Sequence, residues 1–307
     1  MKSSLFSVFR RNVIPTMVSY KIKSGSKFSK FKDSKKLPNN AKFFLPIHRE
    51  TLNISYKNVY TVDEIINSFP ENKIDNDLLV NNFTRKDLLS AEPGSFTLEK
   101  LNNDNEKSLA IYLNEVLFND RLTQDIQETH TNTFVDYLFR ELRFDKYPLS
   151  MKLQLDFSFR ISEHEVFVKI EFSVIKNKVT LCIDEDKHIH TLNRSTKYGE
   201  SQISAEIFAC AYTNFENFYS STFGKDQTVY AIRVIGTRFT FYKVFLSSEY
   251  FKSLDKGFSP NDLTVTIYRF PPNDNEITPF GYDYADKDHR RLILNLLFSL
   301  KEYMLKI

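Results

Sequence analysis

The chain is poor in the residues that mark several common protein classes: its 307 residues include 2 cysteines, 7 glycines and no tryptophan. Cys182 and Cys210 cannot supply a disulfide framework, and the lack of a Cys-x-x-Cys pair argues against structural zinc. The glycines form neither a glycine-rich phosphate loop nor a Gly-x-Ser-x-Gly elbow. No apolar run approaches the roughly 18 residues that a transmembrane helix requires. These absences favour an intracellular globular protein with two buried free thiols and no membrane association.

Positive charge is concentrated at the start of the chain. Residues 1–36 contain 10 lysines and arginines and one acid, Asp33, for a net charge of +9, so the total of +3 leaves about −6 on the rest. An acidic body argues against broad electrostatic capture of nucleic acid, because counterion release requires clustered cations. Any nucleic-acid groove is therefore expected to be locally basic, and the candidate cations are Arg194, Lys197, Arg233 and Arg238.

Residues 1–40 form a basic, serine-rich leader. An apolar stripe can form opposite Arg10 and Arg11, before Pro15, from Leu5, Val8, Phe9 and Val13. This pattern is typical of a mitochondrial presequence. The basic stretch 27–36 also suits a disordered tail that touches nucleic acid, or a nuclear-import signal. The leader therefore predicts a mitochondrial location, with the nucleus as the alternative.

Three consecutive segments alternate apolar and polar residues, which indicates half-buried strands. They span 151–159, 166–175 and 179–183. The polar break Lys176-Asn177-Lys178 predicts an antiparallel hairpin with a loop of about three residues. With that loop, residue 171 pairs with residue 183, and Glu171 lies about one residue pair from Glu185. Two carboxylates are then expected to converge at one end of the hairpin.

The strand after this loop ends in an acidic cluster closed by a lysine, Ile183-Asp184-Glu185-Asp186-Lys187. Side chains two apart on a strand point the same way, so Glu185 and Lys187 share a face. Magnesium takes only one or two protein carboxylates plus substrate oxygens. It also lowers the pKa of a bound water, which Lys187 would orient. The alternative interpretation is a solvated strand end, to which His188 and His190 would also belong.

The elements around this cluster follow in a defined order. A helix over about 124–144 precedes the three strands, and an amphipathic helix opens at Tyr198-Gly199-Glu200-Ser201-Gln202 after them. Segments 228–235 and 238–246 form a predicted hairpin around Gly236-Thr237, and 263–270 is a predicted final strand. A wide apolar stripe predicts a core helix from about Asp286 onward. Residues 41–124 are predicted to form a helical extension.

Residues 125–307 resemble the PD-(D/E)XK nuclease-like superfamily, which has the restriction-endonuclease fold, and within it the divergent domains common in fungal genomes. The resemblance rests on the cluster 183–187, on Gly199-Glu200-Ser201-Gln202, on Gly236-Thr237-Arg238-Phe239-Thr240-Phe241-Tyr242, on Asp288-His289-Arg290-Arg291, and on their order. It implies a mixed α/β (α+β) domain with a central mixed β-sheet flanked by helices.

The resemblance also implies site residues. Glu185 and Lys187 would be the acid and the lysine of the acid-x-lysine motif, and Gln202 the glutamine that begins the next helix. Glu171 stands where the family has an upstream aspartate, and Asp156 is the reserve metal ligand. The implied function is hydrolysis of DNA or RNA with Mg²⁺ or Mn²⁺. The alternative is a catalytically inactive nuclease fold that binds nucleic acid or protein, because fold does not imply activity; a translocated effector is a third hypothesis.

Overall fold

The computed structural model describes residues 37–66, 83–90, 101, 103–122, 127–161, 163–185, 198–217, 223–255, 263–274 and 280–307, so residues 1–36 of the predicted leader lie outside it. The strands are β1 (Ile54–Asn58), β2 (Ser150–Ile161), β3 (His164–Ile175), β4 (Val179–Glu185), β5 (Gln227–Ile235), β6 (Arg238–Leu246), β7 (Val265–Phe270) and β8 (Tyr282–Asp283). The helices are η2 (Ala41–Phe43), α1 (Pro46–Thr51), α2 (Val62–Ile65), α3 (Arg85–Leu89), α4 (Asp104–Asn119), α5 (Glu128–Glu141), α6 (Tyr198–Glu216), α7 (Ser248–Asp255) and α8 (Lys287–Lys306). The strands and long helices predicted between residues 124 and 307 are thus confirmed, and α7 and β8 are additions.

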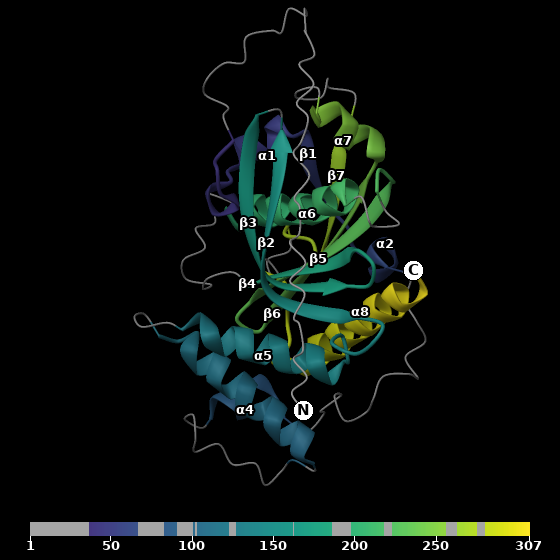
Figure 1. Cartoon of the computed structure of the whole chain (residues 1–307). Coiled ribbons are helices and arrows are strands. Elements are labelled where there is room, and N and C mark those ends of the chain that lie inside the picture. Colours follow the sequence, from purple (N-terminus) through teal and green to yellow (C-terminus); the bar gives the residue numbers. More distant parts are fainter. Residues whose placement is uncertain are drawn as a thin grey trace, which may run out of the picture. The chain divides into compact units, whose positions relative to one another are not determined.

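The strands form one mixed sheet in the order β1-β7-β6-β5-β4-β3-β2, with β8 paired to β6. Strands β2, β3 and β4 make an antiparallel meander. After α6 the chain returns as β5, which lies parallel to β4. Strands β5, β6 and β7 are antiparallel neighbours, and β1 joins β7 in parallel. The predicted mixed α/β class, a central mixed sheet flanked by helices, is confirmed (Figure 1).

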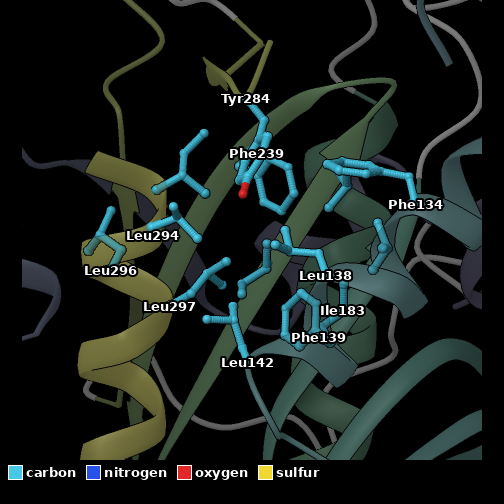
Figure 2. Close-up of a cluster of buried hydrophobic side chains, with 14 of the residues drawn as sticks. Phe134, Leu138, Phe139, Leu142, Ile183, Phe239, Tyr284, Leu294, Leu296 and Leu297 are labelled. Atoms are coloured by element: carbon cyan, nitrogen blue, oxygen red, sulfur yellow. The ribbon is translucent and has the colours of Figure 1, made fainter. Parts of the chain in front are cut away.

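Each face of the sheet has its own hydrophobic core. The first core joins α4, α5 and α8 to Leu181 and Ile183 of β4, and Figure 2 shows side chains of α5 and α8 converging there. The second core joins α6 and α7 to sheet residues that include Cys182. Successive side chains of a strand point to opposite faces, so β4 contributes to both cores. Cys182 and Cys210 are both buried free thiols, as predicted.

The long hairpin β2–β3 passes from one core to the other. Val168 and Ile170 of β3 belong to the second core, whereas Phe172 and Val174 belong to the first, although all four occupy alternate positions of one strand. The change falls opposite Gln154, whose φ of 50° is rare for a non-glycine residue. Alternation therefore predicts which residues are buried here, but not that two different helical layers bury them.

The predicted helical extension contains a strand, which corrects the prediction. Ile54–Asn58 pairs with β7 along its whole length and forms one edge of the sheet. The Tyr250 hydroxyl of α7 donates a hydrogen bond to the Leu52 carbonyl at 2.6 Å, just before that strand. A segment this short gives little periodic signal of its own, and its pairing with β7 decides its conformation. The extension is therefore partly built into the sheet.

Replacing Gly281 with alanine is expected to destabilise the fold by about 1–3 kcal/mol. Gly281 has a φ of +108°, and an added Cβ would lie 2.3 Å from the Phe239 carbonyl oxygen, a backbone atom of β6 that cannot move cheaply. Urea unfolding followed by circular dichroism measures the change. Gly224→Ala is the matched control, because its φ is +63° but no atom lies within 4 Å of the added Cβ. Equal losses in the two variants would contradict a steric origin.

Candidate functional site

The structure places three of the predicted site residues on neighbouring elements. Glu171 of β3 is half-buried and accepts a hydrogen bond from Gln154 Nε2 at 3.2 Å. Asp156 of β2 is exposed and pairs with Lys169, so it lies diagonally from Glu171 on the same face. Gln202 of α6 donates from Nε2 to Glu206 Oε1 at 2.9 Å. Lys187 lies outside the described residues, as does the side chain of Glu185.

A bulge in the β3–β4 hairpin corrects the predicted pairing. Ile175 pairs with Val179 across the expected loop, but a register shift follows at once and Val174 pairs with Leu181. The last pair of the ladder is Phe172 with Ile183, so residue 171 does not face residue 183. One extra residue in β4 shifts the register by one, so each later residue of β4 lies opposite a different residue of β3 from the one predicted. The β4 acid that shares the face of Glu171 is therefore Asp184, and not Glu185.

Helix α6 covers the face that carries Asp184. Cys182, two residues earlier in β4, belongs to the second core together with Ile203 and Ile207 of α6. Near the other end of the helix, the Asn214 side chain binds both the N–H and the C=O of Val179 at 2.9 and 2.8 Å. This anchors the end of α6 at the beginning of β4. The first turns of α6, with Gln202, therefore lie toward the end of β4 where Asp184 stands.

A buried cation lies beside Asp184 in the sheet. Arg233 of β5 is the register partner of Asp184, and in parallel strands such partners share a face. Both side chains are buried, with 3% and 4% of their surfaces exposed. Arg233 is a cation that the sequence predicted for an open groove. Its burial corrects that prediction, because an arginine inside the sheet can neutralise neighbouring carboxylates but cannot track a nucleic-acid backbone on the surface.

A second group of buried polar side chains lies under the first turn of α6. Arg269 of β7 donates from Nε to Glu200 Oε1 at 2.6 Å, and the Tyr242 hydroxyl of β6 lies 3.4 Å from the same oxygen. The Tyr56 hydroxyl of β1 donates to the Glu200 carbonyl, and the Arg49 guanidinium lies 5.0 Å from the Tyr56 ring centroid. Three strands, β1, β6 and β7, thus hold the start of α6 in place, and Arg49 of α1 packs against one of their tyrosines.

Both tyrosines of this group remain protonated at neutral pH. Burial raises the pKa of Tyr56 well above its ordinary value, and the nearby Glu200 carboxylate raises it further. Burial likewise raises the pKa of Tyr242 to about 12, although the positive charge of Arg233 acts in the opposite direction. Protonated phenols can donate hydrogen bonds to the carboxylate and carbonyl of Glu200. The group is therefore a fixed set of donors around one buried acid.

The residues that the sequence missed are Asp184, Glu200 and Arg269. Asp184 and Cys182 are two residues apart in β4, so their side chains point to the same face. This spacing was the signal in the sequence that Asp184 faces α6. Arg269 stands in an apolar strand, where a charge is unexpected, and its partner is 69 residues distant.

Of the other predicted groove cations, Arg238 lies 3.9 Å from Asp283 in an ion pair. Arg194, Lys197, His188 and His190 lie outside the described residues.

The donor set on this face suits a sparse magnesium site. Glu171 and Asp184 provide two carboxylates on one face, and Mg²⁺ commonly takes no more than that from the protein. Two hydroxyl oxygens nearby, Ser173 Oγ of β3 and Ser201 Oγ of α6, are buried and have no hydrogen-bond partner within the described residues. The described part of the chain contains no cluster of three or more potential metal ligands. Substrate oxygens and water would have to complete the coordination.

Comparisons with known proteins leave the family open. No protein-family model matches the chain, and no characterised protein sequence matches it either. A structure titled "Crystal structure of SSO0001" is 11% identical, and the alignment covers 68% of this chain and 81% of that chain with a TM-score of 0.26. Likeness at that level supports no conclusion about function. Among the described residues, no helix combines the length and hydropathy needed to cross a bilayer.

Proposed function

We propose that this chain is a divergent PD-(D/E)XK nuclease-like protein that hydrolyses phosphodiester bonds of DNA or RNA with Mg²⁺ or Mn²⁺. The order of elements supports the proposal, since α5 precedes the β2–β3–β4 meander and α6 connects it to a parallel β5. The observation that carries it is the bulged register, which sets Glu171 and Asp184 on one face beside the start of α6. The basic leader supports a mitochondrial location, with the nucleus as the alternative.

In this proposal Asp184 takes the metal-binding role that the sequence assigned to Glu185. Glu171 and Asp184 would hold the cation, with Asp156 as the reserve ligand. A bound cation would polarise the phosphoryl group and lower the pKa of the attacking water. Gln202 would hold a substrate or water oxygen from the helix side, and Lys187 would balance the negative charge that develops on the phosphate.

The alternative function is a catalytically inactive nuclease fold that binds nucleic acid or protein. One observation favours it: Asp184 is almost fully buried and its register partner is the cation Arg233. Buried charges in proteins are usually paired with a group of opposite sign. A carboxylate neutralised in this way would serve the sheet and would be a poor metal ligand.

Assays with labelled single-stranded and double-stranded DNA and RNA test the proposal, with Mg²⁺, with Mn²⁺ and with EDTA. Cleavage is expected with either metal and not with EDTA. Glu171→Gln and Asp184→Asn should each reduce the rate about 100-fold or more, because metal polarisation contributes several kcal/mol to the transition state. Glu50→Gln, which changes an exposed acid of α1, should cleave like the native chain.

Two results would decide against hydrolysis. One is no metal-dependent cleavage of any substrate by the native chain. The other is cleavage that survives unchanged in both acid variants, which would indicate a contaminating nuclease. Thermal melts of each variant show whether a lost rate reflects a lost fold, and Glu171→Gln is the safer variant because Glu171 is only half-buried.

A further inference from the structure

Three segments meet at the turn of the β3–β4 hairpin, away from the candidate acids. The α5–β2 loop, residues 142–149, is tied to α8 by Lys301 Nζ, which donates to the Leu142 carbonyl at 3.1 Å. The hairpin turn is tied to the end of α8 by Lys176 Nζ, which donates to the Leu305 carbonyl at 2.8 Å. The loop is also joined to the hairpin, because Ser150 pairs with Ile175.

This junction gathers positive charge on a body that is negative overall. Its members come from the loop, the turn and α8, and we call them the hairpin-end surface: Arg143, Lys146, Tyr147, Lys176, Lys178 and Lys301. Burial lowers the pKa of Lys301; the Glu302 carboxylate opposes this, and the positive charge of Arg143 adds to it. Among the described residues, the carboxylates beside these five cations include Glu302 and Asp145, and Asp145 binds Lys146 at 3.1 Å and also Arg140 at 3.4 Å. Positive charge therefore remains in excess.

Arg143 occupies a backbone position that favours glycine. The bonds from Phe144 N–H to the Phe139 carbonyl, at 3.0 Å, and from Arg143 N–H to the Arg140 carbonyl, at 2.8 Å, close α5 as a Schellman motif. The first residue after the cap has a φ of 62° in this motif, and here it is an arginine. Its side chain is exposed and has no ion-pair partner among the described residues. A cation at a helix C-terminus interacts favourably with the helix dipole, but that small gain requires neither an arginine nor an exposed guanidinium at a positive φ.

Tyr147 is the most exposed large apolar side chain of the described residues, at 97%. It makes no ring stacking or hydrogen bond within them, and it follows Lys146 directly in the loop. Tyrosines in folded proteins usually bury the ring and leave only the hydroxyl in water. A fully exposed ring next to Lys146, in the loop that also carries Arg143, offers a flat surface for another aromatic group.

We propose that the hairpin-end surface binds single-stranded nucleic acid, with Tyr147 stacked on one base and the five cations contacting the neighbouring phosphates. The choice of ligand rests on the proposed function. A cationic surface with an aromatic platform is the usual means of holding unpaired strands, because every base has a face that can stack. Duplex DNA suits it less, since paired bases are already stacked on one another. The sequence located the basic groove near Arg233 and Arg238, whereas this surface lies at the opposite end of β4.

Fluorescence anisotropy with a labelled single-stranded oligonucleotide in EDTA tests binding without cleavage. Tyr147→Ala is expected to raise Kd about tenfold, as for the loss of one stacked base. Arg143→Gly should raise Kd several-fold and reduce the slope of log Kd against log salt by about 0.7, as for one phosphate contact. It should not lower the melting temperature, since glycine suits the positive φ, so weaker binding cannot be attributed to unfolding.

Matched controls distinguish this surface from the rest of the molecule. Phe245→Ala removes an exposed ring from β6, and Lys252→Gln removes an exposed cation from α7; neither should change Kd. Glu50→Gln, which changes an exposed acid of α1, should bind like the native chain. Binding is measured in EDTA, where no metal-dependent cleavage occurs, so failure of this proposal is distinguishable from failure of the hydrolase proposal. Unchanged Kd in both Tyr147→Ala and Arg143→Gly would overturn it. So would binding to phosphatidylserine vesicles that depends on these residues while oligonucleotide binding does not.

Discussion

Replacing Arg269 with methionine is expected to lower the free energy of unfolding by about 3–5 kcal/mol, because the change leaves a buried carboxylate without its cation. Only 1% of the Arg269 surface is exposed, and its guanidinium binds Glu200 Oε1 at 2.6 Å and also the Pro271 carbonyl. In the variant, the Tyr242 hydroxyl is left near a carboxylate that still has to stay out of water. Urea unfolding followed by circular dichroism measures the loss.

The double variant Arg269→Met with Glu200→Gln separates the stranded charge from lost packing. Neutralising the acid should recover about 1 kcal/mol or more relative to Arg269→Met alone, which is the coupling expected between contacting groups. Arg238→Met is the matched control, since Arg238 lies 3.9 Å from Asp283 and is partly exposed; it should cost no more than about 1 kcal/mol. Equal losses of unfolding free energy in Arg269→Met and Arg238→Met would mean that burial does not make the Glu200–Arg269 pair more important for stability than a partly exposed ion pair.

Replacing Phe239 with alanine is expected to cost about 3–5 kcal/mol, the range for deleting a large aromatic side chain from a packed core. Phe239 of β6 is fully buried in the first core. Its ring centroid lies 6.1 Å from that of Phe134 on α5 and 5.8 Å from that of Tyr284, which precedes α8 (Figure 2). Three separate parts of the chain therefore lose contacts together. Urea unfolding measures the loss.

Phe245→Ala supplies the comparison on the same strand. Phe245 is 56% exposed, so its removal should change the free energy of unfolding by no more than about 0.5 kcal/mol. A small effect at Phe239 would mean that the space it leaves is refilled by its neighbours. A large effect at Phe245 would mean that its exposed ring makes contacts outside the described residues.

Much of the fold could be predicted because its strands and long helices are strongly periodic. Alternation over 166–175 and 238–246 located β3 and β6 closely, since a half-buried strand requires an apolar residue at every second position. The short strand Ile54–Asn58 was missed, because five residues carry too little periodicity and its conformation depends on β7. The hairpin-end surface was missed for a different reason: its cations are distant in sequence, and only the packing of α8 against the α5–β2 loop brings them together.

The candidate site shows how one local irregularity can change a prediction. A three-residue loop placed residue 171 opposite residue 183, and that pairing put Glu185 about one residue pair from Glu171, on the same face. The bulge after Val174 adds one residue to β4 and makes Asp184 the partner. A single inserted residue cannot be recognised from the periodic pattern, because the strand on either side of it still alternates between apolar and polar residues.

The sequence by itself determined the class of fold, the order of the main elements, and the presence of acids near the end of β4. These follow from local patterns of apolar and polar residues, because a strand or helix can bury one face only if its apolar residues recur at the spacing of that face. Tertiary structure alone decided which acid faces Glu171, that Arg233 and Arg269 are buried, and where exposed cations gather. Those outcomes depend on register and on contacts between segments far apart in the chain, where a shift of one residue exchanges the two faces of a strand.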